Sequence, residues 1–169
     1  EINLQNTSIF DSQQNGILIS GMSNYSLDNL TIKDAGLGHG SSNNCASVYE
    51  CNGISINLNS NTNRQTIISN LTIINSWNSG ILHESLSQSN TISIDIIIVD
   101  SQIKGSKGES QILFRGYTHN ATVLRTDVID AGQGGPGLGA GNSYGIKVDN
   151  AMLYVINSNI SNNSNIKMT

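Results

Sequence analysis

The feature that most constrains this chain is an internal repeat of short apolar segments. One unit reads Ile or Val, any residue, Asp or Asn, and then a small residue. Its copies occupy residues 9–12, 32–35, 73–76, 98–101, 128–131 and 160–163. A unit that returns six times along 169 residues predicts a stack of equivalent supersecondary elements that share one elongated core.

Two further units accompany the first one, and both alternate inward and outward positions. In the second unit a Gly commonly precedes the pair, and the pairs are Ile17/Ile19, Ile54/Ile56, Ile81/His83, Ile112/Phe114, Ile146/Val148 and Ile166/Met168. In the third unit, which usually lies five residues before the first unit, the pairs are Ile2/Leu4, Tyr25/Leu27, Thr66/Ile68, Ile92/Ile94, Thr122/Val123 and Leu153/Val155. Alternation with period two is typical of strands, so we expect three strands in each of six repeats.

Composition agrees with strands that are joined by polar turns. Charged residues make up 12% of the chain, about half the usual fraction, which argues against a solvated helical protein and against a disordered tail. Ile is the most frequent apolar residue, and it prefers a pleated surface. Between the third and first units lie pairs such as Asp28-Asn29 and Ser69-Asn70, residue types that tolerate left-handed backbone.

The three units resemble, over essentially the whole chain, the right-handed parallel β-helix of the pectate-lyase-like superfold. The resemblance implies an all-β protein, a right-handed parallel β-helix (solenoid) of about six coils of three strands, with residues 1–169 as one domain. A β-sandwich would not repeat the same three-strand order six times. Lyases, hydrolases, epimerases, phage tailspikes and adhesins share this fold, so the resemblance implies no single function.

The spacing between units varies at only one corner of the repeat. The long connections are residues 35–52, 102–110 and 131–144, and each separates a first unit from the second unit that follows it. Since loops on a fixed scaffold carry binding surfaces, we expect them to form one rim along the stack. In polysaccharide-acting members of the superfold, the corresponding loops border the strand whose outward side forms the sugar cleft.

Four charged residues on the outward side of the second-unit strands are the candidate site. Glu84, Arg115 and Asp149 should stand on consecutive repeats with Lys147 beside them. If the protein is an enzyme, these are the catalytic residues that we predict, because such a cluster can bind a uronate and lower the pKa of a basic group. The alternative is that opposite charges simply pair across the stack.

Two covalent features bear on the compartment. Cys45 and Cys51 are six residues apart, which suits a small disulfide loop within the chain; two free thiols or a bridge between chains are the alternatives. Seven Asn-x-Ser/Thr sequons are possible glycosylation sites, close to the number that chance gives in so Asn-rich a sequence: Asn6, Asn24, Asn29, Asn70, Asn120, Asn159 and Asn162. We expect an extracellular or cell-surface protein.

Several partners are excluded by the same residues. The net charge of -4 argues against nucleic acid, and the longest apolar run, residues 96–99, is too short for a membrane-spanning helix. No short segment offers three acidic ligands for calcium, so we expect no metal and no cofactor.

Two functions remain. The chain shows no capping helix or polar final turn, so it is expected either to be a segment of a longer solenoid or to bind other copies of itself through uncapped solenoid ends. The first function is a non-catalytic structural or adhesive β-solenoid that self-associates coil on coil into a fibre, hoop or sheath. The alternative is a carbohydrate-active β-helix, lyase-like or tailspike-like, that binds or cleaves an acidic polysaccharide.

Overall fold

The structure is a computed structural model that describes residues 2–21, 24–36, 45, 50–58, 64–85, 94–108, 110–116, 120–131, 144–163 and 165–168. This part of the chain is all β and contains no helix. Its strands are β1 (Ile2–Phe10), β2 (Ile17–Gly21), β3 (Tyr25–Lys33), β4 (Ile54–Leu58), β5 (Arg64–Ile74), β6 (Ile81–Ser85), β7 (Ile94–Val99), β8 (Gln102–Lys104), β9 (Ser110–Gly116), β10 (Asn120–Leu124), β11 (Asp127–Ile129), β12 (Tyr144–Val148), β13 (Met152–Ile156), β14 (Asn159–Ser161) and β15 (Asn165–Met168).

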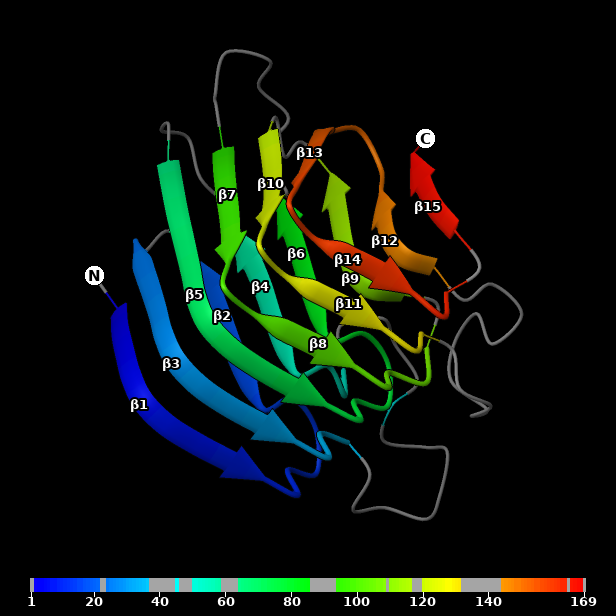
Figure 1. The fold of residues 1–169 in the computed structure, drawn as a ribbon. Coiled ribbons are helices and arrows are strands. Elements are labelled where there is room, and N and C mark those ends of the chain that lie inside the picture. The colour runs from blue at the N-terminus through cyan, green and yellow to red at the C-terminus, as the bar shows by residue number, and fades with distance from the viewer. Residues whose placement is uncertain are drawn as a thin grey trace.

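The strands form two parallel sheets. Sheet A has nine strands, namely β1, β3, β5, β7, β8, β10, β11, β13 and β14. Sheet B has six strands in chain order, from β2 through β4, β6, β9 and β12 to β15. The chain passes from sheet A to sheet B and back in each repeat, and the N- and C-termini lie at opposite ends of the array (Figure 1).

Sheet A is sharply bent, and left-handed residues mark the bend. Asn6, Asn29 and Asn70 have φ of 51°, 52° and 52° and lie inside the long strands β1, β3 and β5. At the same place in later repeats, Asp100, Arg125 and Asn157 also have positive φ and separate the two halves of the sheet into β7/β8, β10/β11 and β13/β14. The predicted left-handed turn between the third and first units is therefore confirmed.

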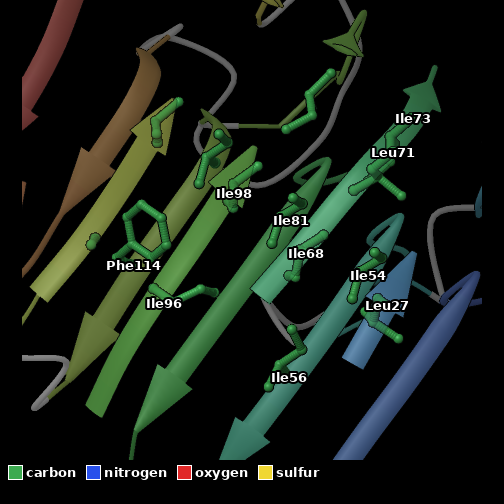
Figure 2. Close-up of a cluster of buried hydrophobic side chains, with 14 of the residues drawn as sticks. Leu27, Ile54, Ile56, Ile68, Leu71, Ile73, Ile81, Ile96, Ile98 and Phe114 are labelled. Carbon is green, nitrogen blue, oxygen red and sulfur yellow. The ribbon is translucent and has the colours of Figure 1, made fainter. Parts of the chain in front are cut away.

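The inward side chains form continuous columns between the sheets (Figure 2). Ile17, Ile54, Ile81, Ile112 and Ile146 are direct register neighbours in sheet B. Ile32 and Ile73 are buried neighbours in sheet A, and Ile9 pairs with Ile32 at the edge. The predicted inward positions are confirmed, with Ile17 and Ile160 only partly buried because they lie in edge strands.

The fourth repeat was predicted wrongly. Ile98 pairs with Ile68 and Val123, so it belongs to the third unit, and Ile103 of β8 pairs with Ile73 and Val128 in the first unit. The segment 98–101 fits the first-unit pattern because it also has a left-handed residue, Asp100, two positions after its Ile. The true first unit of this repeat has Gly105 at that position instead of Asp or Asn, so the pattern did not find it. Residues 102–110 are therefore not a plain insertion, since they contain β8.

The third-unit pairs change with this register. The fourth pair is Ile96/Ile98 rather than Ile92/Ile94, and Ile92 lies outside the described residues. The fifth pair is Ala121/Val123 rather than Thr122/Val123, because Ala121 pairs with Ile96 and is buried.

Close approach of the two sheets explains why Gly precedes the second unit. A Cβ on Gly53 would lie 2.6 Å from Cγ2 of Ile73, and one on Gly145 would lie 2.6 Å from Cγ2 of Ile160. These distances are too short for real carbon contacts, so the first-unit Ile occupies the space that a side chain would need. The exceptions among these positions are the buried Gln111, before Ile112, and Asn165, before Ile166.

We predict that Ile81→Ala lowers the free energy of unfolding by about 2–5 kcal/mol, because truncation leaves a cavity between Ile54 and Ile112. Chemical denaturation followed by circular dichroism measures the change. Leu18→Ala is the matched control; this side chain is 59% exposed, so we expect a change within about 0.5 kcal/mol. Equal effects of the two substitutions would contradict the inward assignment.

Candidate functional site

The outward side of sheet B carries the four charged residues that the sequence singled out. Glu84 and Arg115 are direct register neighbours on β6 and β9. Asp149 follows β12, and its backbone N–H donates to the carbonyl of Phe114 at 2.9 Å, which places it beside the Arg115 strand position. Lys147 lies on β12 next to Leu113. The expected row of charges on consecutive repeats is thus present in the backbone register.

The charges approach each other as two ion pairs. Arg115 Nε lies 3.8 Å from Glu84 Oε1, and Lys147 Nζ lies 3.9 Å from Asp149 Oδ2. The Glu84 side chain is buried and the Arg115 side chain is 44% exposed, so solvent screens their attraction. Pairs of this kind contribute about 0–1 kcal/mol. Chemically, the half-exposed guanidinium is the group best able to bind an anion from solution.

This outward side is more buried than alternation predicts. Ser55, Leu82 and Leu113 point away from the core yet are almost inaccessible, and the two leucines lie outside the main core cluster. Two buried polar atoms here, Ser55 Oγ and Asn57 Oδ1, have no hydrogen-bond partner. Period-two alternation carries no signal for such burial, so the sequence predicted solvent-exposed positions.

His83 is the one titratable side chain in the sheet B core columns of the described part. Its register neighbours are Ile56 and Phe114, and its ring meets Phe114 in an edge-to-face arrangement with centroids 6.4 Å apart. Burial lowers the pKa of His83 to about 4, so the imidazole is neutral at pH 7. It acts as a core residue, as the sequence pattern indicated, and not as part of the charged row.

We predict an acid-dependent loss of stability that originates at His83. Because its pKa is about 4 when folded and 6.5 when unfolded, the unfolded chain binds the extra proton between these values. Stability should fall as the pH drops from 6.5 and lose about 3 kcal/mol by pH 4.

The measurement is urea denaturation of the wild type and of His83→Leu at several pH values. The variant keeps an apolar side chain of similar size between Ile56 and Phe114 but cannot take up a proton. Its stability should stay nearly flat over the same range. An identical pH dependence in both proteins would assign the effect to other groups.

Polar ladders run along the bend of sheet A, and their pairing could not be predicted from the repeat pattern. Asp28 accepts bonds from the Ser69 hydroxyl at 2.7 Å and the Asn70 amide at 2.9 Å, and these bonds lower its pKa. Asp100 accepts two bonds from Arg125, at 2.6 and 2.7 Å, which lower the pKa of the carboxyl and raise that of the guanidinium. The pairing depends on which repeats are adjacent, which only the fold decides.

The predicted disulfide is confirmed. Cys45 and Cys51 are joined, with their Cα atoms 5.6 Å apart, and both residues are buried. Cys51 has a positive φ of 61°, and the glycine at position 36 leaves room for its side chain. Most of the 35–52 and 131–144 connections lie outside the described residues.

Several sequon asparagines take part in the ladders. Asn29, Asn70, Asn120 and Asn162 donate their side-chain amides to Asn6, Asp28, Asp95 and Asp130. Asn24 accepts from Arg64 at 2.9 Å, whereas Asn159 lies exposed in edge strand β14. The Asn-x-Ser/Thr pattern at Asn29 and Asn70 follows from the repeat itself, because a left-handed Asn precedes one inward and one outward residue.

Comparisons with family models, with curated proteins and with solved structures each find no match for this chain. Among the described residues, no group of three or more His, Cys, Asp or Glu side chains is arranged to hold a metal ion. The same part of the chain contains no helix with the length and hydropathy to cross a bilayer.

Proposed function

We propose that the two parallel sheets are faces of a right-handed parallel β-helix of about six coils. Three features support this fold. The strands return to sheets A and B in a constant order, each pair is parallel, and equivalent residues lie in register from one repeat to the next. Right-handed crossovers account for about 98% of connections between parallel strands of one sheet.

We propose that the protein is a non-catalytic structural or adhesive component that associates with other copies of itself. The observation that carries this proposal is the pair of open edges: within the described residues, β1 pairs with β3 alone and β13 pairs with β10 alone. Inward residues in these strands stay accessible, with Ile2 at 40% and Val155 at 37%. Unpaired edges with accessible apolar columns are templates for another strand. The buried disulfide supports an extracellular or cell-surface location.

We predict that the purified chain forms rod-like assemblies that lengthen with protein concentration, as measured by sedimentation velocity and electron microscopy. The double variant Leu4→Lys/Val155→Lys should remain monomeric. In the free chain each lysine can reach solvent from an edge strand, whereas a paired edge would bury its charge.

The matched control is Gln5→Lys/Tyr154→Lys. It adds the same charges to the same two strands at outward positions, which pairing of the edges leaves in solvent. This control should assemble like the wild type. A wild-type chain that stays monomeric at every concentration tested would contradict the proposed self-association.

A second candidate function, binding of an acidic polysaccharide, is favoured by one observation on sheet B. Arg115, whose side chain is 44% exposed, lies in one outward row with Glu84 and Asn57, on three consecutive strands of sheet B. An accessible cation in a polar row is suited to a ligand with carboxylates and hydroxyls. The ion pairs with Glu84 and between Lys147 and Asp149 equally fit a purely structural row.

We predict that Arg115→Ala separates these functions. If sheet B binds or cleaves a uronate polymer, the substitution should abolish binding or turnover, because it removes the accessible cation. If the protein is structural, assembly should be unchanged and stability should change by about 1 kcal/mol or less. Isothermal titration with oligogalacturonate and thermal unfolding measure the two outcomes, and Lys33→Ala, on the outward side of sheet A, is the control for nonspecific charge effects.

A further inference from the structure

The side-chain ladders have one direction. In the following side-chain pairs of the described residues, the donor lies on the repeat nearer the C-terminus and the acceptor on the repeat before it. These pairs are Asn29 to Asn6, Arg64 to Asn24, Ser69 and Asn70 to Asp28, Asn75 to Asp34, Asn120 to Asp95, Arg125 to Asp100, and Asn162 to Asp130.

The direction does not depend on how the oxygen and nitrogen of each Asn side chain are assigned, because most of the acceptors are aspartates. An ionised carboxylate accepts hydrogen bonds and cannot donate them. Asp28, Asp34, Asp95, Asp100 and Asp130 each receive their bond from the following repeat. The two ends of the described array consequently differ in chemistry as well as in sequence.

The N-terminal edge presents acidic and amide groups. Asp11 follows β1, and its backbone N–H bonds to the carbonyl of Lys33 at 3.1 Å, so it lies beside Asp34 in the column of left-handed residues. Asn6 accepts from Asn29 through its oxygen, which leaves its amide group as the donor for the open side. At the opposite edge, the column that begins at Asn6 ends in Asn157, and the column that begins at Asp11 ends in Asn162. Neither of these two asparagines carries a charge.

From this difference we propose that copies join head to tail, an inference that rests on the proposed self-association. The β13/β14 edge of one copy pairs in parallel with β1 of the next. The core columns then continue, with Leu4 in line with Val155 and Ile9 in line with Ile160. Asn157 Oδ1 can accept from the amide of Asn6, which continues the direction of the ladders. Asn162 meets Asp11 and can donate its second amide hydrogen to this carboxylate, so this one contact runs in the opposite direction.

The two symmetric alternatives are less favourable. Joining two N-terminal edges, or two C-terminal edges, would pair strands antiparallel at the junction, so the core columns and the ladders would be interrupted there. With β1 paired antiparallel to its own copy, the two Asp11 residues would lie at opposite ends of the contact, and neither would meet an Asn162 donor. A head-to-tail contact is heterologous, so it leaves one free edge of each kind and permits open-ended growth.

The test uses the two single variants separately and mixed. Leu4→Lys blocks only the β1 edge, and Val155→Lys blocks only the β13 edge. For head-to-tail contacts, each variant alone should be monomeric, with association at least about 100-fold weaker than in the wild type. An equimolar mixture should form 1:1 dimers that grow no further, because the open C-terminal edge of Leu4→Lys pairs with the open N-terminal edge of Val155→Lys and both remaining edges carry a lysine. Sedimentation velocity and native mass spectrometry, with one variant isotopically labelled, identify the mixed dimer.

Other results overturn the inference. Dimers of Val155→Lys alone would show contact between N-terminal edges, and dimers of Leu4→Lys alone would show contact between C-terminal edges. A mixture that stays monomeric while the wild type assembles would also refute head-to-tail pairing, whereas a monomeric wild type would refute self-association itself. If thermal unfolding shows that either variant is misfolded, Ile9→Lys and Ile160→Lys test the same edges at partly buried positions.

Discussion

The spacing of parallel strands is the constraint on which this structure depends. Neighbouring strands lie about 4.8 Å apart, so equivalent side chains in consecutive repeats are always in contact. Apolar residues gain by this because Ile54, Ile81 and Ile112 form one dry column. Polar residues at the bend of sheet A bond to their neighbours, as Asn70 does to Asp28. The repeat therefore constrains the type of residue in each column more than the identity of any single residue.

The columns explain what could be predicted from the sequence. Inward positions require an apolar residue in each repeat. Left-handed positions require a residue that tolerates positive φ, and among residues with side chains Asn and Asp do so best. Ile32, Ile73 and Asn29 could be assigned for this reason. The fourth repeat could not, because Ile98 and Ile103 both meet the same two requirements and only the pairing with β5 separates them.

The candidate site was predicted less completely. Alternation correctly placed Glu84 and Arg115 side by side, since register follows from the repeat. It could not show that Ser55 and Leu82 on the same side are buried, because period two reports direction and not accessibility. The pairing of Asp100 with Arg125 was also missed; arginine is an unusual residue for a left-handed turn, and its role is clear only from the neighbouring repeat.

The contact between a glycine of sheet B and an isoleucine of sheet A has an evolutionary consequence. Gly53 faces Ile73 and Gly145 faces Ile160, so a larger residue at either glycine requires a smaller partner; at Gly53 the carbonyl oxygen of Gly80, also 2.6 Å from the added Cβ, must move as well. The chain already contains one such exchange: where Gln111 replaces the glycine, the corresponding residue of β11 is Val128 instead of isoleucine. Mutations at these positions are thus epistatic, and their order of fixation matters. Across divergent copies of this repeat, the two positions should covary although more than a dozen residues separate them in sequence.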